Sequence, residues 1–428
     1  MAFVVKTART LRNNWKKSTF AVIVLTWGGS YTKHYFDTRS LMKGYCERAA
    51  QLGSRPIAVN QNPRTVTVIL NPNANKRKAQ AEFEKYCAPL LHLAGISLEV
   101  IKTESEGHAK QLIESVADAE AVVVAGGDGT LSEVVTGLLR RTNENCVVPI
   151  GVLPLGKNNT VARLLFPAET KLEKVKSLAD ATMAVIEEVT KPVDVMRIEI
   201  LDTEAHESRK PIYAVSGIKW GAYRDAEVKK DSYWYFGGLK KYATYLLNGL
   251  KGSLSWDCQA QLVYSPPCTG CSNCRQVQTS TQPKSWWFQR YNSLINQLGI
   301  SFIKKDDSLK YQRIHNPQCT QQMEKQVTTA DLTLFTSNAI RTDGDPKLNL
   351  RIGPQNVDYM DFVKQGWKSE LGESREVKEA IEARTIEINP KKGSEEAWFS
   401  IDNENYEVKP IRVTLLPKVL NMFCQEAV

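Results

Sequence analysis

The sequence predicts an α/β domain with a parallel sheet, followed by an antiparallel β-sandwich domain and preceded by a short membrane-anchor helix. Three observations support this fold class. Over residues 64–192, short β-branched runs alternate with stretches of helical apolar spacing, as in parallel βαβ units. From residue 193 onward, apolar runs follow one another without helical stretches between them, which favours an antiparallel sheet. Residues 1–36 are basic and surround an uncharged, largely apolar segment.

Length and composition exclude several classes of protein. The 428 residues are enough for two or three domains, and 42% hydrophobic and 24% charged residues are ordinary globular values. A wholly disordered chain, a collagen and a polytopic membrane protein are therefore excluded. The net charge of +9 could indicate a nucleic-acid binder, but six basic residues and no acidic residue lie within the first 36. The remaining 392 residues are nearly neutral, and we expect no nucleic-acid partner.

The N-terminal segment, residues 1–36, is interpreted as a targeting and anchor element. Its uncharged run covers residues 18–32. As a helix this run is roughly 22 Å long, short of the ~30 Å hydrocarbon core unless the flanking lysines reach the head groups. Trp27 and Tyr31 disfavour a secretory cleavage site, whereas a basic, acid-poor start is typical of mitochondrial presequences. We favour an uncleaved anchor that also directs the chain to mitochondria, with a cleaved targeting peptide as the alternative.

Residues 37–63 are polar and irregular, contain Pro56 and Pro63, and are predicted to be a linker. The α/β domain, residues 64–192, then begins with a β-branched strand. Its predicted strands are 66–70, 98–101, 121–125 and 150–153, and its predicted helices are 77–94, 107–118 and 131–140. The strands are continuously apolar, which predicts a sheet buried on both faces.

The second domain, residues 193–428, is predicted to be built from strands. These are 193–200, 212–215, 330–337, 348–352, 384–388, 397–401 and 411–416. A polar, Gln-rich segment at about 260–330 interrupts the pattern, and a stretch of this kind within a compact domain is best treated as an insertion.

The insertion contains a cysteine cluster. Cys268, Cys271 and Cys274 follow one another at two-residue spacing, with His315 and Cys319 downstream. The spacing suits a zinc site, but a disulfide or thiols without a partner would fit the sequence as well. The odd total of nine cysteines argues against a fully paired disulfide scaffold.

The strongest chemical signal is the loop Gly126-Gly127-Asp128-Gly129-Thr130, placed directly after the strand at 121–125 and before a helix. Glycines let backbone N–H groups approach phosphate oxygens, and the following helix adds its positive N-terminal end. An aspartate in such an anion-binding loop indicates a cation such as Mg²⁺ or a proton acceptor. The loop therefore predicts a phosphate site, although it matches neither Walker A nor G-x-G-x-x-G.

Two further polar loops follow predicted strands, at residues 71–76 and 154–159. The carboxyl ends of parallel strands meet at one edge of a sheet, so these loops are expected to gather beside the glycine loop. Three polar loops at one edge predict a nucleotide-binding crevice.

These motifs resemble a known family. Four motifs resemble the diacylglycerol kinase catalytic family. They are the GGDGT loop, the Asn-Pro loop at 71–72, the P-L-G-x-x-N loop at 154–159, and Lys102-Thr103 followed by Gly107-His108-Ala109. That family includes sphingosine kinases, ceramide kinases and bacterial lipid kinases. Longer stretches, such as VAGGDGTLSE at 124–133, resemble its branch of acylglycerol kinases from animal mitochondria. The resemblance covers nearly the whole chain except residues 260–330.

The resemblance implies that the first domain binds ATP, that Mg²⁺ is the metal cofactor, and that a lipid binds between the two domains. The implied reaction is phosphorylation of the free hydroxyl of monoacylglycerol and diacylglycerol to lysophosphatidic acid and phosphatidic acid. The implied location is the mitochondrial inner membrane, with the catalytic domain facing the intermembrane space. The carrier translocase of that membrane is an implied partner.

The resemblance also implies the site residues. The nucleotide-contact positions are Asn71, Thr103, Gly126, Gly127, Asp128, Gly129, Thr130, Glu133 and Gly156, and Lys157 is expected to add a phosphate contact. Asp225 matches an aspartate that contacts the substrate head group. Glu404 and Asp128 are the candidate catalytic carboxylates, with Glu404 as base and Asp128 organising metal or phosphate.

The sequence departs from the family pattern at Asn75 and Asn403, where glycine is usual, and at Lys157, where a small hydroxyl residue is usual. Three alternatives remain open. The chain could be mainly a structural subunit of the carrier translocase with a vestigial kinase site, or a ceramide or sphingosine kinase. An NAD kinase shares the GGDG loop, but its Asn-Glu-x-x-x-Gly signature is absent here.

Overall fold

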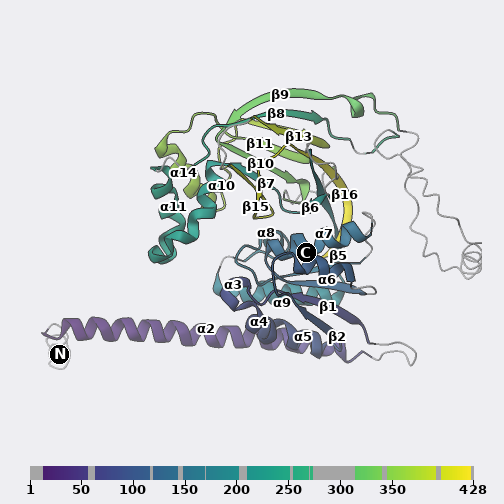
Figure 1. The fold of residues 1–428 in the computed structure, drawn as a ribbon. Helices are drawn as coiled ribbons and strands as arrows, with labels where there is room; N and C mark the ends of the chain where they lie inside the picture. Colours follow the sequence, from purple (N-terminus) through teal and green to yellow (C-terminus); the bar gives the residue numbers. More distant parts are fainter. Residues whose placement is uncertain are drawn as a thin grey trace, which may run out of the picture. The chain divides into compact units, whose positions relative to one another are not determined.

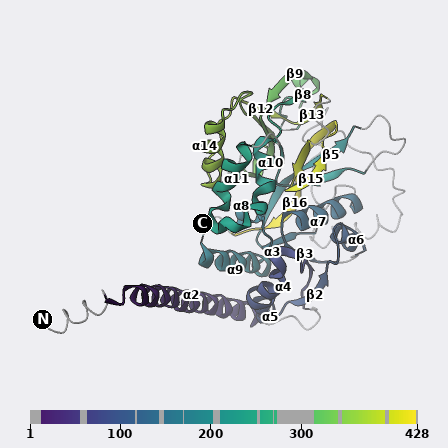
Figure 2. The same ribbon diagram turned by 60° about the vertical axis from the view of Figure 1, so that its left-hand side comes forward.

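The computed structural model divides into two compact units, which are drawn in Figures 1 and 2. Unit 1 is residues 1–192 with 420–428, and unit 2 is residues 193–419. The structure describes residues 13–55, 63–115, 119–142, 148–168, 170–201, 210–250, 254–268, 270–272, 314–339, 345–391 and 397–425. Cys274 and most of the predicted insertion lie outside the described residues.

Unit 1 contains the predicted parallel sheet. Its strand order is β2 (Ser97–Lys102), β1 (Thr65–Leu70), β3 (Ala121–Gly126) and β4 (Ile150–Pro154), all parallel. The end of β16 (Ile411–Phe423) adds a further parallel strand beside β4, where Met422 pairs with Ile150. Every residue of β3 is buried, as its continuous apolar sequence predicts. The α/β part of the predicted fold is therefore confirmed.

Helices cover this sheet. They are α5 (Ala88–Leu93), α6 (His108–Ser115), α7 (Asp128–Arg141), α8 (Thr160–Leu165) and α9 (Lys171–Glu187). Alternate residues of β1 and β3, including Val68 and Val123, share one apolar cluster with residues of α5 and α9. The central strand β3 is buried on both faces, whereas the edge strand β2 is largely exposed. Polar chemistry at the buried central strands is therefore confined to their ends.

The prediction of one continuous helix over 77–94 is wrong. This region holds α3 (Ala74–Arg77), α4 (Ala79–Glu82), one π-helical turn at Phe83–Cys87, and then α5. Asn75 and Lys76 have positive φ angles of 50° and 56°, which interrupt the helix at its start. Pro89 lies in the first turn of α5, where its missing N–H group breaks the helical hydrogen-bond ladder.

The prediction of a linker over 37–63 is wrong for residues 37–53, because α2 (Trp15–Gly53) is a 39-residue helix. Its C-terminal part packs on α5 and α9: Ala49 is fully buried in a cluster with Leu90 and Met183. Apolar side chains of this part recur at helical spacing, a signal that the polar composition obscured. None of the helices in the described residues has the length and apolar character needed to cross a membrane.

Unit 2 contains two sheets around one apolar core. The six-stranded antiparallel sheet runs in the order β12 (Glu379–Ala383), β11 (Leu348–Ile352), β10 (Asp331–Thr336), β7 (Ile218–Gly221), β14 (Trp398–Ile401) and β15 (Glu404–Glu407). The second sheet contains β16, β13 (Thr385–Pro390), β8 (Cys258–Ser265), β9 (Met323–Thr329), β5 (Thr190–Ile200) and β6 (Ile212–Ala214). Trp220 of one sheet and Leu262 of the other belong to the same buried cluster. The antiparallel part of the predicted fold is confirmed.

Two sequence predictions for this domain need correction. Helices do lie between its strands: α10 (Ala222–Lys229), the 3₁₀ segment η2 (Lys230–Leu239), α11 (Lys240–Gly249) and α14 (Tyr359–Glu370). They pack around aromatic rings such as Tyr223, Tyr245 and Phe362. The ends of the predicted insertion are also strands, because β8 and β9 pair from Cys258 with Thr329 to Tyr264 with Met323.

The contact between α6 and α7 gives a test of the packing in unit 1. A Cβ atom on Gly137 would lie 2.2 Å from Cγ2 of Ile113 and 2.8 Å from the carbonyl oxygen of Lys110. We expect Gly137→Ala to push the two helices apart and destabilise unit 1 by about 1–3 kcal/mol. A Cβ on Gly44 of α2 would meet no atom within 4 Å, so Gly44→Ala should gain up to about 1 kcal/mol in helix propensity. Thermal unfolding should show a Tm below that of the wild type for Gly137→Ala but not for Gly44→Ala. A Tm of Gly137→Ala equal to that of the wild type would contradict the close packing of α6 on α7.

Candidate functional site

Two glycines bring the loops after β3 and β4 into backbone contact. Gly127 precedes α7 in an extended conformation, with φ −106° and ψ −171°. A Cβ atom on Gly156 would lie only 2.2 Å from Cα of Gly127. Any larger residue at position 156 would separate the loops, so the close approach of the two backbones depends on this glycine.

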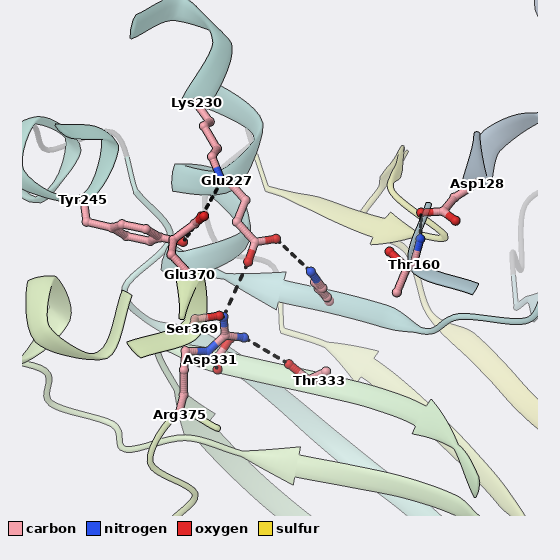
Figure 3. Close-up of polar contacts among 11 residues, drawn as sticks. Asp128, Thr160, Glu227, Lys230, Tyr245, Asp331, Thr333, Ser369, Glu370 and Arg375 are labelled. Carbon is pink, nitrogen blue, oxygen red and sulfur yellow. Dashed lines mark hydrogen bonds and ion pairs between the residues drawn. The ribbon is translucent and has the colours of Figure 1, made fainter. Parts of the chain in front are cut away.

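Asp128 holds the second of these loops in place. Its carboxylate is buried and accepts hydrogen bonds from the backbone N–H groups of Thr160 at 2.9 Å and Val161 at 3.4 Å, the first residues of α8. Figure 3 shows the contact between Asp128 and Thr160. The N–H group of Asp128 in turn donates to the carbonyl oxygen of Asn158 at 3.1 Å. Asp128 therefore caps α8 and links the start of α7 to the loop at 154–159.

Glu133, one turn further along α7, caps α6 in the same way. Its two carboxylate oxygens accept the N–H groups of Gly107 at 2.9 Å and Ala109 at 3.1 Å. Gly107 has a φ angle of +79°, which a glycine adopts without strain. The loop between β2 and α6, which begins at the buried Thr103, is thus also tied to α7.

Thr130 is the third side chain of α7 that holds a neighbouring loop. Its hydroxyl accepts a hydrogen bond from the side-chain amide of Asn71 at 3.1 Å, and the amide oxygen of Asn71 accepts the N–H group of Asn73 at 3.0 Å. Three side chains from the first two turns of α7 therefore each hold a different loop. The structure brings the predicted loops together at the carboxyl ends of β1, β3 and β4, around the N-terminus of a 14-residue helix.

The arrangement suits an anion better than a protein-bound Mg²⁺. The carboxylate oxygens of Asp128 and Glu133 already accept hydrogen bonds from backbone N–H groups, so their role in this structure is to hold the loops in place. The glycine contact and the N-terminus of α7 supply positive partial charge, and Lys157 is exposed on the adjoining loop. These loops can hold phosphate groups.

In unit 2, one arginine joins two of the predicted site regions. Asp225 on α10 pairs with Arg224, at 2.8 Å between Oδ1 and Nη1, and its Oδ2 accepts the N–H group of Ser255 at 2.9 Å. The buried Arg224 also donates to the side-chain oxygen of Asn405, the neighbour of Glu404 in β15. The sequence alone did not predict the contact between Arg224 and Asn405, because 181 positions separate the two residues and no local pattern indicates their pairing.

Glu404 follows a rigid turn. The buried carboxylate of Asp402 accepts three backbone N–H groups, from Val215 at 2.9 Å, Ser216 at 2.8 Å and Gly217 at 3.0 Å. Asp402 and Asn403 have φ angles of 47° and 67°, a region that asparagine and aspartate tolerate better than most residues. Asn403 can therefore replace the glycine that is usual at this position.

A buried charge network fixes α10 (Figure 3). The guanidinium of Arg375 binds both carboxylate oxygens of Asp331, at 2.9 and 3.2 Å, and lies 3.5 Å from Glu227. Glu227 also pairs with Lys219 at 2.8 Å, and Arg375 lies over the ring of Tyr223. The network joins α10 to β7, to β10 and to the segment that follows α14. Its member on α10, Glu227, lies two residues after Asp225.

Burial and neighbouring charges shift the pKa values of this network in opposite directions. Burial alone would raise the pKa of Glu227, but Lys219 and Arg375 outweigh it, and the pKa lies below its ordinary value of 4.5. Burial raises the pKa of Asp331 in spite of Arg375. The pKa of Arg375 is raised, because Asp331 and Glu227 outweigh its own burial. The guanidinium therefore stays charged and can hold both carboxylates.

Comparisons with known proteins agree with this geometry. Residues 65–198 match the diacylglycerol kinase catalytic domain, and residues 215–428 match the acylglycerol kinase C-terminal region. Human mitochondrial acylglycerol kinase is 35% identical over 424 residues, covering 97% of this chain and 96% of the human protein. The chain belongs to the acylglycerol kinase family. Membership of this family makes it a lipid kinase, and the resemblance seen in the sequence is confirmed.

More distant relatives cover parts of this acylglycerol kinase family member. Human sphingosine kinase 1 is 28% identical over 191 residues, which are 43% of this chain and 48% of that protein. A crystal structure of a candidate diacylglycerol kinase from Bacillus anthracis covers 87% of this chain and all of its own, with 15% identity and a TM-score of 0.51. At that identity the likeness shows a shared fold alone.

The lowered pKa of Glu227 predicts a pH dependence of stability. Ionised Glu227 stabilises unit 2 at pH values above about 4.5, and this contribution is lost as the pH falls through the lower folded-state pKa. The Tm of the wild type should therefore exceed that of Glu227→Gln near pH 7, and the difference should shrink below about pH 4.5. Thermal unfolding across this range measures it, with Glu373→Gln at an exposed position as control. A difference that does not change with pH would contradict the assignment.

Proposed function

We propose that this chain is an ATP-dependent kinase that phosphorylates the free hydroxyl of monoacylglycerol and diacylglycerol. The products are lysophosphatidic acid and phosphatidic acid. The observation that carries the proposal is the set of Asp128, Thr130 and Glu133, which holds three loops around the N-terminus of α7. The choice of acylglycerols follows from membership of the acylglycerol kinase family.

In this proposal the loops of unit 1 bind the phosphates of ATP. Asp128 and Glu133 act as positioning residues, because their carboxylates hold the starts of α8 and α6. Mg²⁺ would arrive with the nucleotide and neutralise phosphate charge. The residues assigned to nucleotide contact are Asn71, Thr103, Gly126, Gly127, Gly129, Thr130, Gly156 and Lys157.

Unit 2 supplies the candidate base. The lipid hydroxyl oxygen attacks the γ-phosphorus, the bond from that phosphorus to the ADP oxygen breaks, and Glu404 takes the hydroxyl proton. The hydroxyl of Tyr406 donates a hydrogen bond to the Glu404 carboxylate at 3.3 Å. Asp225, held by Arg224 and Ser255, is assigned to the polar head of the lipid.

The proposal also includes attachment of α2 to the mitochondrial inner membrane, with the catalytic units in the intermembrane space. The N-terminal part of α2 exposes large apolar side chains, whereas its C-terminal part packs on unit 1. These exposed residues are Trp15, Phe20, Val22, Ile23, Val24, Leu25, Trp27, Tyr31, Tyr35 and Phe36. A large apolar surface flanked by lysines suits a membrane interface.

Kinase assays on a panel of acceptors test the function. Purified full-length chain is given ATP and Mg²⁺ with vesicles containing monoacylglycerol, diacylglycerol, sphingosine or ceramide, and separately with NAD. We expect phosphorylation of the acylglycerols and none in Gly127→Glu, whose side chain would crowd the carbonyl oxygen of Asn158 and repel phosphate. Preference for sphingosine, ceramide or NAD would overturn the substrate. Inactivity with every acceptor would favour a non-catalytic subunit of the carrier translocase.

The role of Glu404 gives a sharper prediction. Glu404→Gln removes the proton acceptor, so we expect kcat to fall by about 100-fold or more while ATP affinity changes only a few fold. Glu407→Gln is the matched control, because Glu407 lies at the other end of β15 and pairs with Lys409 at 3.0 Å. Steady-state kinetics and ATP titration measure the two quantities. Wild-type turnover in Glu404→Gln would reject Glu404 as the base.

A further inference from the structure

Three cysteines from two separate segments meet beside the β8–β9 pair. Cys268 and Cys271 follow β8, and Cys319 lies in a 3₁₀ turn (Pro317–Thr320) that precedes β9. Their Sγ atoms all lie within 4.8 Å of one another. Cys271 and Cys319 are fully buried. The strand pairing places the two segments side by side, although 48 residues separate Cys271 from Cys319.

Backbone and side-chain contacts support the meeting of the two segments. The N–H group of Ser272 donates to the carbonyl oxygen of Ile314 at 3.0 Å. The side-chain amide of Asn316 donates to Sγ of Cys268 at 3.5 Å. Hydrogen bonds from neighbouring groups to the ligands are a regular feature of protein metal sites.

The geometry suits one metal ion better than a disulfide. Zinc binds thiolates at about 2.3 Å in a tetrahedron, which places sulfur atoms about 3.8 Å apart. Three sulfurs within 4.8 Å of one another can reach that spacing by small side-chain rotations. A disulfide brings two sulfurs to about 2.05 Å and would leave the third cysteine without a role.

We propose that Cys268, Cys271 and Cys319 bind a structural Zn²⁺ ion as thiolates. Each thiol gives up its proton on binding, so three thiolates surround the dication. Of the cysteines that the sequence offers for a zinc site, the structure brings Cys268, Cys271 and Cys319 together. Structural sites take a fourth ligand. His315 is exposed and does not join the three cysteines, and Cys274 lies outside the described residues.

The proposed ion would close the connection between β8 and β9 at its base. Closing a long connection costs conformational entropy, and a metal that fixes both ends offsets this cost in unit 2. The site uses none of the residues assigned to phosphoryl transfer, so its test does not depend on kinase activity.

Metal content of the purified full-length protein tests the proposal. After expression in zinc-supplemented medium we expect about one zinc ion per chain. Cys271→Ser and Cys319→Ser should lose it, whereas Cys46→Ser, a change in α2, should retain it. Replacement by Co²⁺ should give the thiolate charge-transfer and tetrahedral ligand-field bands, and Cys268→Ser should weaken the charge-transfer band.

Three results would overturn the site. These are a wild type without zinc, stoichiometric zinc in both Cys271→Ser and Cys319→Ser, or a disulfide between two of the three cysteines by alkylation and mass mapping. If the serine variants precipitate, the wild type alone decides. Zinc removal by a chelator should then lower the Tm and Zn²⁺ addition should restore it, and an unchanged Tm would reject a structural ion.

Discussion

The candidate site depends on one constraint, the need of backbone N–H groups at helix starts for acceptors. The first N–H groups of a helix have no acceptor within it, and they are costly to bury unpaired. In unit 1, Asp128 and Glu133 supply acceptors to α8 and α6 from the first two turns of α7. The loops after three strands are therefore held by one helix, and a change in α7 would move all of them together.

In unit 2, a carboxylate likewise accepts backbone N–H groups at the turn before Glu404, although these N–H groups lie between two strands and not at a helix start. Asp402 accepts three successive N–H groups, which fixes a turn that contains two positive φ angles. Charge-assisted hydrogen bonds of this kind are stronger than neutral ones and offset the strain of the turn. Two residues after Asp402, the Glu404 carboxylate accepts a hydrogen bond from the hydroxyl of Tyr406 at 3.3 Å. The proposed function assigns proton transfer to Glu404 by the family resemblance, and positioning to Asp128 because its carboxylate holds the start of α8.

Local sequence patterns were sufficient for the parallel sheet and the glycine loop, because both arise from neighbouring residues. Continuous β-branched runs form β1 and β3, and glycines stand where the loops after β3 and β4 touch. The docking part of α2 was missed because its apolar residues are diluted by charged ones. Contacts between distant residues left no local signal: Arg224 reaches Asn405 across 181 residues, and Arg375 reaches Asp331 across 44.

The network of Arg375, Asp331 and Glu227 shows what such distant contacts contribute. Removing charges from water is costly, and apolar residues of similar volume often stabilise a fold as well as a buried ion pair does. The raised pKa of Asp331 reflects that cost directly. The guanidinium of Arg375 nevertheless makes directional contacts to both Asp331 of β10 and Glu227 of α10, and so ties the helix to the strand. Asp225, which the proposed function assigns to the lipid head, lies two residues before Glu227 on the same helix, so the network also holds the helix that carries it.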